Sequence, residues 1–117
     1  MISYGKQSIN QDDIDAVVDV LKSDFLTQGP KVVEFENDLA NYCEAKYAKA
    51  VNNGTAALHL AYLAIGLEQG DIVWTTPNTF VATANAALYC GATVDFVDID
   101  PKTYNLSIDY LKEKLIQ

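Results

Sequence analysis

Short β-prone runs alternate with apolar helical stretches throughout the second half of the sequence. Each run and the helix expected after it occupy 47–52 then 55–66, 72–75 then 79–90, and 93–97 then 108–115. Because parallel strands must be joined by a long crossover, usually a helix, this alternation favours an α/β fold with a mostly parallel sheet. Such sheets bind ligands beyond the carboxyl ends of their strands. The candidate binding loops are therefore Asn52–Thr55, Thr75–Thr79 and Asp98–Pro101.

The N-terminal part of the sequence carries two amphipathic helical patterns. The first follows Asn10, a residue type favoured as an N-cap. The second begins at Pro30, which suits the first position of a helix because it has no N–H to leave unpaired, and it runs to about Ala45. We therefore expect one domain with a helical segment and an alternating segment, 1–46 and 47–117.

Between Val51 and Leu58 a β-prone run turns directly into an apolar helix. The first N–H groups of a helix are unpaired, and the positive end of the helix dipole points to the same place. Gly54 allows a close approach to the backbone, and Thr55 adds a hydroxyl donor. This arrangement can hold a phosphate without a lysine. The other interpretation, that Asn53-Gly54-Thr55 is only a turn and a helix cap, remains open at this point.

The composition excludes several classes of partner. The formal net charge of −8, from 8 basic and 16 acidic residues, argues against nucleic acid and against an anionic membrane surface. No apolar run is long enough to cross a membrane, and the N-terminus lacks the apolar centre of a signal peptide. One histidine and two separated cysteines do not form a recognisable metal site. We therefore expect a cytoplasmic protein without a bound metal.

A set of short motifs runs along nearly the whole chain in a fixed order. They are Phe25–Pro30 followed by Phe35-Glu36, Asn53–Leu60, Gly70-Asp71, Thr76–Ala86, Gly91-Ala92 and Asp98–Asp100. As an ordered set they resemble the DegT/DnrJ/EryC1/StrS family of sugar aminotransferases. Three further stretches are most similar to the family members of the pseudaminic acid pathway, which aminate C4 of a UDP-linked 4-keto-6-deoxy-2-acetamido sugar. They are Tyr4–Ile9, Ser23–Pro30 and Asp98–Asn105.

The resemblance implies a fold and a cofactor. The fold is a three-layer αβα sandwich, of which 1–117 would be the N-terminal part of the large domain of fold type I, the aspartate-aminotransferase-like enzymes. The cofactor is pyridoxal 5′-phosphate (PLP). Its phosphate would be held at Gly54, Thr55 and Ala56, in agreement with the reading of the helix start, and Phe80 would stack on its ring. Without the resemblance, Phe80 would be taken for an ordinary core aromatic.

The resemblance also implies an activity, the transfer of an amino group, usually from glutamate, to a 4-keto-6-deoxy nucleotide sugar by a homodimeric enzyme. Tyr4, Lys6, Thr27 and Gln28 would lie near the sugar nucleotide, although Lys6 fits equally well as a solvated surface charge. No catalytic residue is assigned, because none of the eight lysines stands in the family's lysine motif. PLP chemistry requires a lysine for the Schiff base. We therefore expect 1–117 to be the front part of a longer enzyme and inactive alone.

Two alternatives and two residue assignments remain. The chain could belong to a sugar dehydratase of the same family, with histidine in place of the lysine, or it could be a non-catalytic phosphate-binding α/β module. His59 is expected to hydrogen-bond within the core rather than to take part in catalysis. Asp98 and Asp100 are expected to end a strand and orient a turn rather than to act as an acid–base pair.

Overall fold

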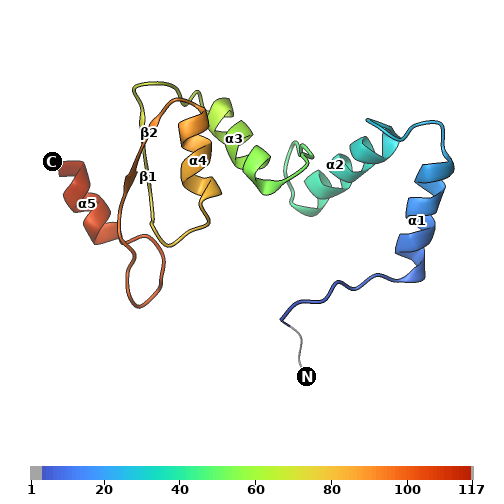
Figure 1. Cartoon of the computed structure of the whole chain (residues 1–117), viewed down its shortest axis with the longest axis horizontal. Coiled ribbons are helices and arrows are strands. Elements are labelled where there is room, and N and C mark those ends of the chain that lie inside the picture. The colour runs from blue at the N-terminus through green and yellow to red at the C-terminus, as the bar shows by residue number, and fades with distance from the viewer. Residues whose placement is uncertain (1–3, 117) are drawn as a thin grey trace. The chain divides into compact units, whose positions relative to one another are not determined.

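The computed structural model describes residues 4–116, which form five helices and two strands (Figure 1). In chain order they are α1 Gln11–Lys22, α2 Pro30–Tyr42, α3 Gly54–Ala64, β1 Ile72–Thr75, α4 Ala82–Tyr89, β2 Thr93–Phe96 and α5 Ile108–Ile116. The chain divides between Ala50 and Val51 into two units. The first contains α1 and α2, and the second contains the remaining elements.

In the first unit, both helices begin where the sequence predicts. The Asp13 N–H donates to Asn10 Oδ1 at 3.0 Å and the Asn10 N–H donates to Asp13 Oδ2 at 2.9 Å, which is a reciprocal capping box. Pro30 is the first residue of α2. This helix ends at Tyr42, three residues before the expected end, because Glu44 adopts a left-handed backbone conformation with φ of 51°.

The second unit is built on a parallel pair of strands, and this confirms the predicted α/β class. Ile72 of β1 lies opposite Thr93 of β2, and the register continues to Thr75 opposite Phe96. Helix α4 packs against both strands and against α3. Helix α5 lies on the other side of the pair (Figure 1), where the Lys114 ammonium donates to the Phe96 carbonyl at 2.7 Å.

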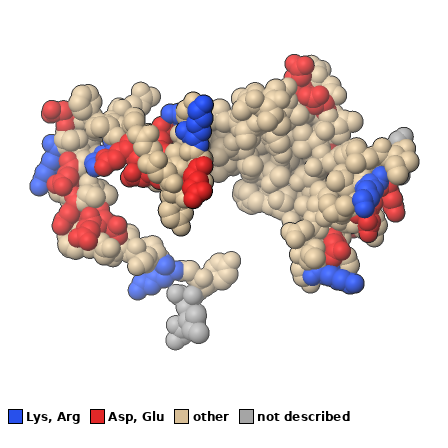
Figure 2. All heavy atoms as spheres, turned by 180° about the vertical axis from the view of Figure 1, so that it is seen from behind, with Lys and Arg blue, Asp and Glu red and all other residues tan. Residues whose placement is uncertain are grey.

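The core of this unit consists of small side chains at the centre of α4. Ala86 and Ala87 are fully buried, and Val97, directly after β2, is also buried. Alanines allow α4 to lie close to its neighbours. Helices α3 and α4 contain no charged residue, and Figure 2 shows most of the second unit as an uncharged surface, whereas acidic and basic groups crowd the first.

The strand predicted at 47–52 is wrong, because these residues form no strand in the structure. A β-strand needs a second strand to accept and donate its backbone hydrogen bonds. Here a side chain accepts from the backbone instead. The Ala50 N–H donates to Glu36 Oε1 at 3.0 Å, and the Lys49 ammonium donates to Glu36 Oε2 at 2.7 Å. Hydrogen bonds from these two groups lower the pKa of Glu36. Glu36 of α2 thus fixes the end of the first unit.

The helix predicted at 79–90 begins later, at Ala82. The loop before it makes local hydrogen bonds that compete with helix formation. In particular, the Asn78 N–H donates to the Thr76 hydroxyl at 2.9 Å. The strand predictions at 72–75 and 93–97 are confirmed to within one residue. The predicted cap of α5 is also confirmed, because the Tyr110 N–H donates to Ser107 Oγ at 3.3 Å.

Candidate functional site

The N-terminus of α3 is capped by a side chain and still has free donors. The Ala56 N–H donates to Asn53 Oδ1 at 2.8 Å, and the Ala57 N–H donates to the Asn53 carbonyl at 3.2 Å. The N–H groups of Gly54 and Thr55 donate to no acceptor within residues 4–116. The cap therefore occupies the amide of Ala56, and two unpaired donors remain at the positive end of the helix dipole.

An apolar concavity of about 510 Å³ opens beside these donors. Its lining comes from α3, from the loop after β1 and from the first residue of α4. The residues are Gly54, Thr55, Ala57, Leu58, Ala61, Phe80 and Ala82. The structure thus brings together three of the four residues that the sequence predicts for a cofactor, Gly54, Thr55 and Phe80. Ala56 does not line the concavity, and its amide is already paired.

Phe80 is the most exposed large apolar residue of this lining. Its side chain is 76% accessible although it is a large apolar group. It lies in the loop between β1 and α4, beyond the carboxyl end of β1, where ligands of parallel sheets bind. An aromatic face exposed in a concave, uncharged surface is suited to stacking on a flat ring. This exposure does not fit the ordinary core position that the sequence would suggest without the family resemblance, and ring stacking stays the prediction.

Three lining residues of α3 were not predicted from the sequence. Ala57, Leu58 and Ala61 follow Gly54 at helical spacings of three, four and seven residues. Residues at these spacings share one face of a helix. The spacing was visible in the sequence, but α3 is apolar nearly all round, so that it did not indicate which face borders a ligand.

The third candidate loop lies elsewhere. Asp98 lines a separate shallow hollow of about 220 Å³ together with Tyr110, Glu113 and Lys114 of α5. Asp100 Oδ1 accepts from the N–H groups of Lys102 at 2.7 Å and Thr103 at 3.0 Å. These hydrogen bonds lower the pKa of Asp100. The prediction that Asp100 orients a turn is confirmed.

His59 packs against an aromatic ring of the neighbouring helix. Its imidazole meets the Tyr89 ring edge-on, with 5.5 Å between the ring centroids and 67° between the planes. Among the described residues no hydrogen bond of its side chain accompanies this contact, so that the expected core hydrogen bond is replaced by an aromatic pair. Within residues 4–116, no three or more His, Cys, Asp or Glu side chains are grouped so that they could hold a metal ion.

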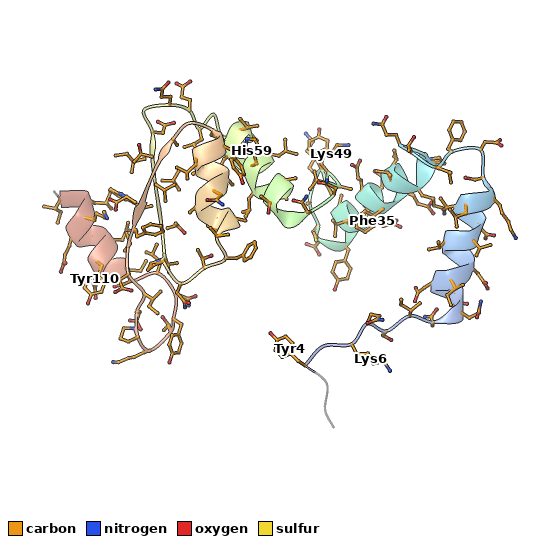
Figure 3. All side chains as sticks on the ribbon, viewed as in Figure 1. Tyr4, Lys6, Phe35, Lys49, His59 and Tyr110 are labelled. Carbon is orange, nitrogen blue, oxygen red and sulfur yellow. The ribbon has the colours of Figure 1, made fainter. Side chains whose placement is uncertain are left out.

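The residues predicted to contact a sugar nucleotide all lie in the first unit and are exposed. Tyr4 and Lys6 belong to the segment before α1 (Figure 3). Thr27 and Gln28 belong to the loop between α1 and α2, where Gln28 has a φ of 50°. Gly29, next in that loop, is buried, and a Cβ there would lie 3.0 Å from Phe25 Cβ. The loop is therefore tightly shaped, and its role stays a prediction.

The sequence pattern of the DegT/DnrJ/EryC1/StrS aminotransferase family matches residues 7–117. The chain belongs to this family. A curated relative, the UDP-4-amino-4,6-dideoxy-N-acetyl-beta-L-altrosamine transaminase of Campylobacter jejuni, is 54% identical over 99 residues, which cover 85% of the chain and 26% of the relative. The similarity to the pseudaminic acid branch of the family is thereby confirmed. The chain spans about a quarter of the length of the curated relatives that it matches.

Solved structures of this aminotransferase family share the fold. The sugar aminotransferase Spr1654 of Streptococcus pneumoniae in its PLP form superposes with a TM-score of 0.91 at 32% identity, over 96% of the chain and 29% of Spr1654. Helicobacter pylori PseC, an aminotransferase of pseudaminic acid biosynthesis, superposes with a TM-score of 0.87 at 36% identity, over 98% of the chain and 31% of PseC. The fold type I assignment is confirmed. None of the helices described here is both long and apolar enough to span a bilayer.

Proposed function

We propose that this chain is the cofactor-binding N-terminal part of a PLP-dependent nucleotide-sugar aminotransferase. The observation that carries the proposal is the single concavity that joins the free donors of Gly54 and Thr55 to the exposed ring of Phe80. Family membership makes PLP the ligand to consider first, since Spr1654 has been solved in its PLP and pyridoxamine phosphate forms.

The residues fit the two ends of that cofactor. The phosphate would accept hydrogen bonds from the N–H groups of Gly54 and Thr55 and from the Thr55 hydroxyl, with the helix dipole favouring its charge. The ring would lie against Phe80, and Leu58 and Ala61 would keep water from its edge. A volume of about 510 Å³ is within the usual range for small-molecule sites. When bound, PLP supplies the electron sink for amino transfer.

The substrates are inferred from the relatives. A 4-keto-6-deoxy nucleotide sugar would accept the amino group, and glutamate would provide it. Tyr4, Lys6, Thr27 and Gln28 would contact the sugar nucleotide from the first unit. We propose that the Schiff-base lysine lies outside 1–117, since no lysine of this chain stands in the family's motif, and that the complete enzyme is a homodimer. The 117-residue chain should then show no transamination of a 4-keto sugar nucleotide, and measurable turnover would refute this part.

Cofactor binding can be tested without the lysine. Pyridoxamine 5′-phosphate carries the ring and the phosphate but no aldehyde, so that it cannot form Schiff bases with surface lysines. We expect calorimetric titration to show saturable binding of this probe, and at least roughly tenfold weaker binding of pyridoxamine, because hydrogen bonds to a charged group contribute about 1.5–3 kcal/mol each. Equal affinity for the two compounds, or no binding of either, would overturn the proposed site.

A variant of the helix start completes the test. Thr55→Val removes one donor and keeps the shape of the side chain, and it should weaken binding of the phosphorylated probe but not of pyridoxamine. Thr93→Val is the matched control, because Thr93 lies on β2 and does not line the concavity. Its affinity for the probe should equal that of the parent chain.

A further inference from the structure

Phe80 is held in place by its backbone rather than by packing. Its side chain is 76% accessible, so that few neighbours restrain the ring. Its carbonyl accepts from the Thr83 N–H at 3.0 Å, which forms the turn that leads into α4. The residue before it is held to the same threonine, because the hydroxyls of Thr79 and Thr83 lie 3.0 Å apart in a hydrogen bond. Thr83 therefore holds the segment on both sides of Phe80.

The same threonine connects this segment to the helix that carries the phosphate donors. The Tyr62 hydroxyl of α3 donates to the Thr83 carbonyl at 3.4 Å. Next to Thr83, Ala82 is 4% accessible and anchors the start of α4. Gly54 begins α3, and Phe80 lies in the loop just before α4. The hydrogen bond from Tyr62 to Thr83 therefore links the two helices next to which these residues lie.

We propose that Thr79 and Thr83 are positioning residues, whose paired hydroxyls keep the Phe80 ring facing the concavity before a ligand arrives. This inference rests on the proposed function, because it assigns the ring-binding half of that site. A ring that is already oriented loses less freedom when it stacks on a ligand, so that preorganisation appears as affinity. Through Phe80, the hydroxyl pair affects the binding of the ligand's ring and not the binding of its phosphate.

The test removes one hydroxyl and keeps the shape of the side chain. Thr79 is exposed, so that Thr79→Val leaves the core intact. In the 117-residue chain, we expect Thr79→Val to weaken pyridoxamine 5′-phosphate binding by about threefold, the effect of one modest hydrogen bond. The affinity for inorganic phosphate, measured by phosphorus NMR, should not change. Thr79→Ser, which restores the hydroxyl, should restore the affinity.

Three results would overturn the inference. They are unchanged affinity in Thr79→Val, equal loss for the two ligands, and failure of Thr79→Ser to restore binding.

A ligand-free measurement separates this inference from the proposed function. Three-bond HN–Hα couplings and amide relaxation should show a single backbone conformation at Phe80 in the parent chain and conformational averaging in Thr79→Val. If the probe does not bind the parent chain, the proposed function fails, and the role in ligand binding fails with it. If the couplings do not change, the hydroxyl pair does not position the ring.

Discussion

The replacement Asn53→Asp separates helix capping from anion binding at α3. Asn53 Oδ1 accepts from the Ala56 N–H at 2.8 Å. Aspartate caps helices about as well as asparagine, and a negative charge in this position gains about 0.3–1 kcal/mol from the helix dipole. The free energy of unfolding of the second unit should therefore stay the same or rise by up to about 1 kcal/mol. If Asn53 only capped the helix, the replacement would have no effect on ligand binding.

The same replacement should strongly reduce binding of a phosphate at Gly54 and Thr55. Two unit charges about 4 Å apart repel each other by about 4 kcal/mol at the effective dielectric constant of about 20 found near protein surfaces. Salt screens part of this repulsion. We therefore expect pyridoxamine 5′-phosphate to bind at least about tenfold more weakly to Asn53→Asp, with a smaller loss at high salt.

Two assays read the two effects separately. Urea unfolding followed by circular dichroism gives the stability, and calorimetric titration gives the affinity for the probe. Gln69→Glu is the matched control, because it introduces the same charge beyond the opposite end of α3, an 11-residue helix that spans about 16 Å. That distance exceeds the screening length of about 8–10 Å, so the control should bind normally. An Asn53→Asp chain that binds the probe as tightly as its parent would refute the reasoning.

Three further predictions concern the framework that carries the site. Hydrogen bonds from Lys49 and from a backbone amide lower the pKa of Glu36. The stability that the Glu36 carboxylate contributes is therefore complete above its unfolded-state pKa and is lost as the pH falls through its folded-state pKa. Carbon NMR should show a depressed titration midpoint for Glu36, and an ordinary midpoint would contradict these contacts. Ala86 is fully buried, and Ala86→Leu should cost about 1–3 kcal/mol by overpacking in urea unfolding, whereas no change would show a loose core. Gly91 has a φ of 81°, so Gly91→Ala should cost about 1–2 kcal/mol, against almost none for Gly5→Ala, which has open space; equal effects would refute the strain.

Local chemistry explains why much of the fold could be predicted from the sequence. Asn10 and Pro30 mark helix starts through properties of single residues, and both predictions hold. The strand expected at 47–52 fails for the opposite reason. Its formation depends on a partner distant in sequence, and in this chain Glu36 binds Ala50 instead. A β-prone run indicates that a strand is possible, but it does not supply the second strand.

The candidate site shows the same division between local and non-local information. The unpaired donors of Gly54 and Thr55 follow from a helix that begins at Gly54, directly after Asn53, and the abrupt change from a β-prone run to an apolar helix indicates them in the sequence. The meeting of these donors with Phe80 depends on the packing of α3 on α4. The resemblance to the family predicted that Phe80 and these donors belong to one site, whereas helical spacing alone did not. The capping role of Asn53 was an open alternative that the structure shows to coexist with the free donors.

The central claim is that the start of α3 and the ring of Phe80 form one phosphate-and-ring site. Amide NMR of the chain during titration with pyridoxamine 5′-phosphate tests it most directly. We predict that the largest shifts occur at the amides of Gly54 and Thr55, that resonances of Phe80 shift at the same ligand concentrations, and that inorganic phosphate reproduces only the amide shifts. Saturable binding with its largest shifts away from these residues, or no shift at Gly54 and Thr55, would contradict the account.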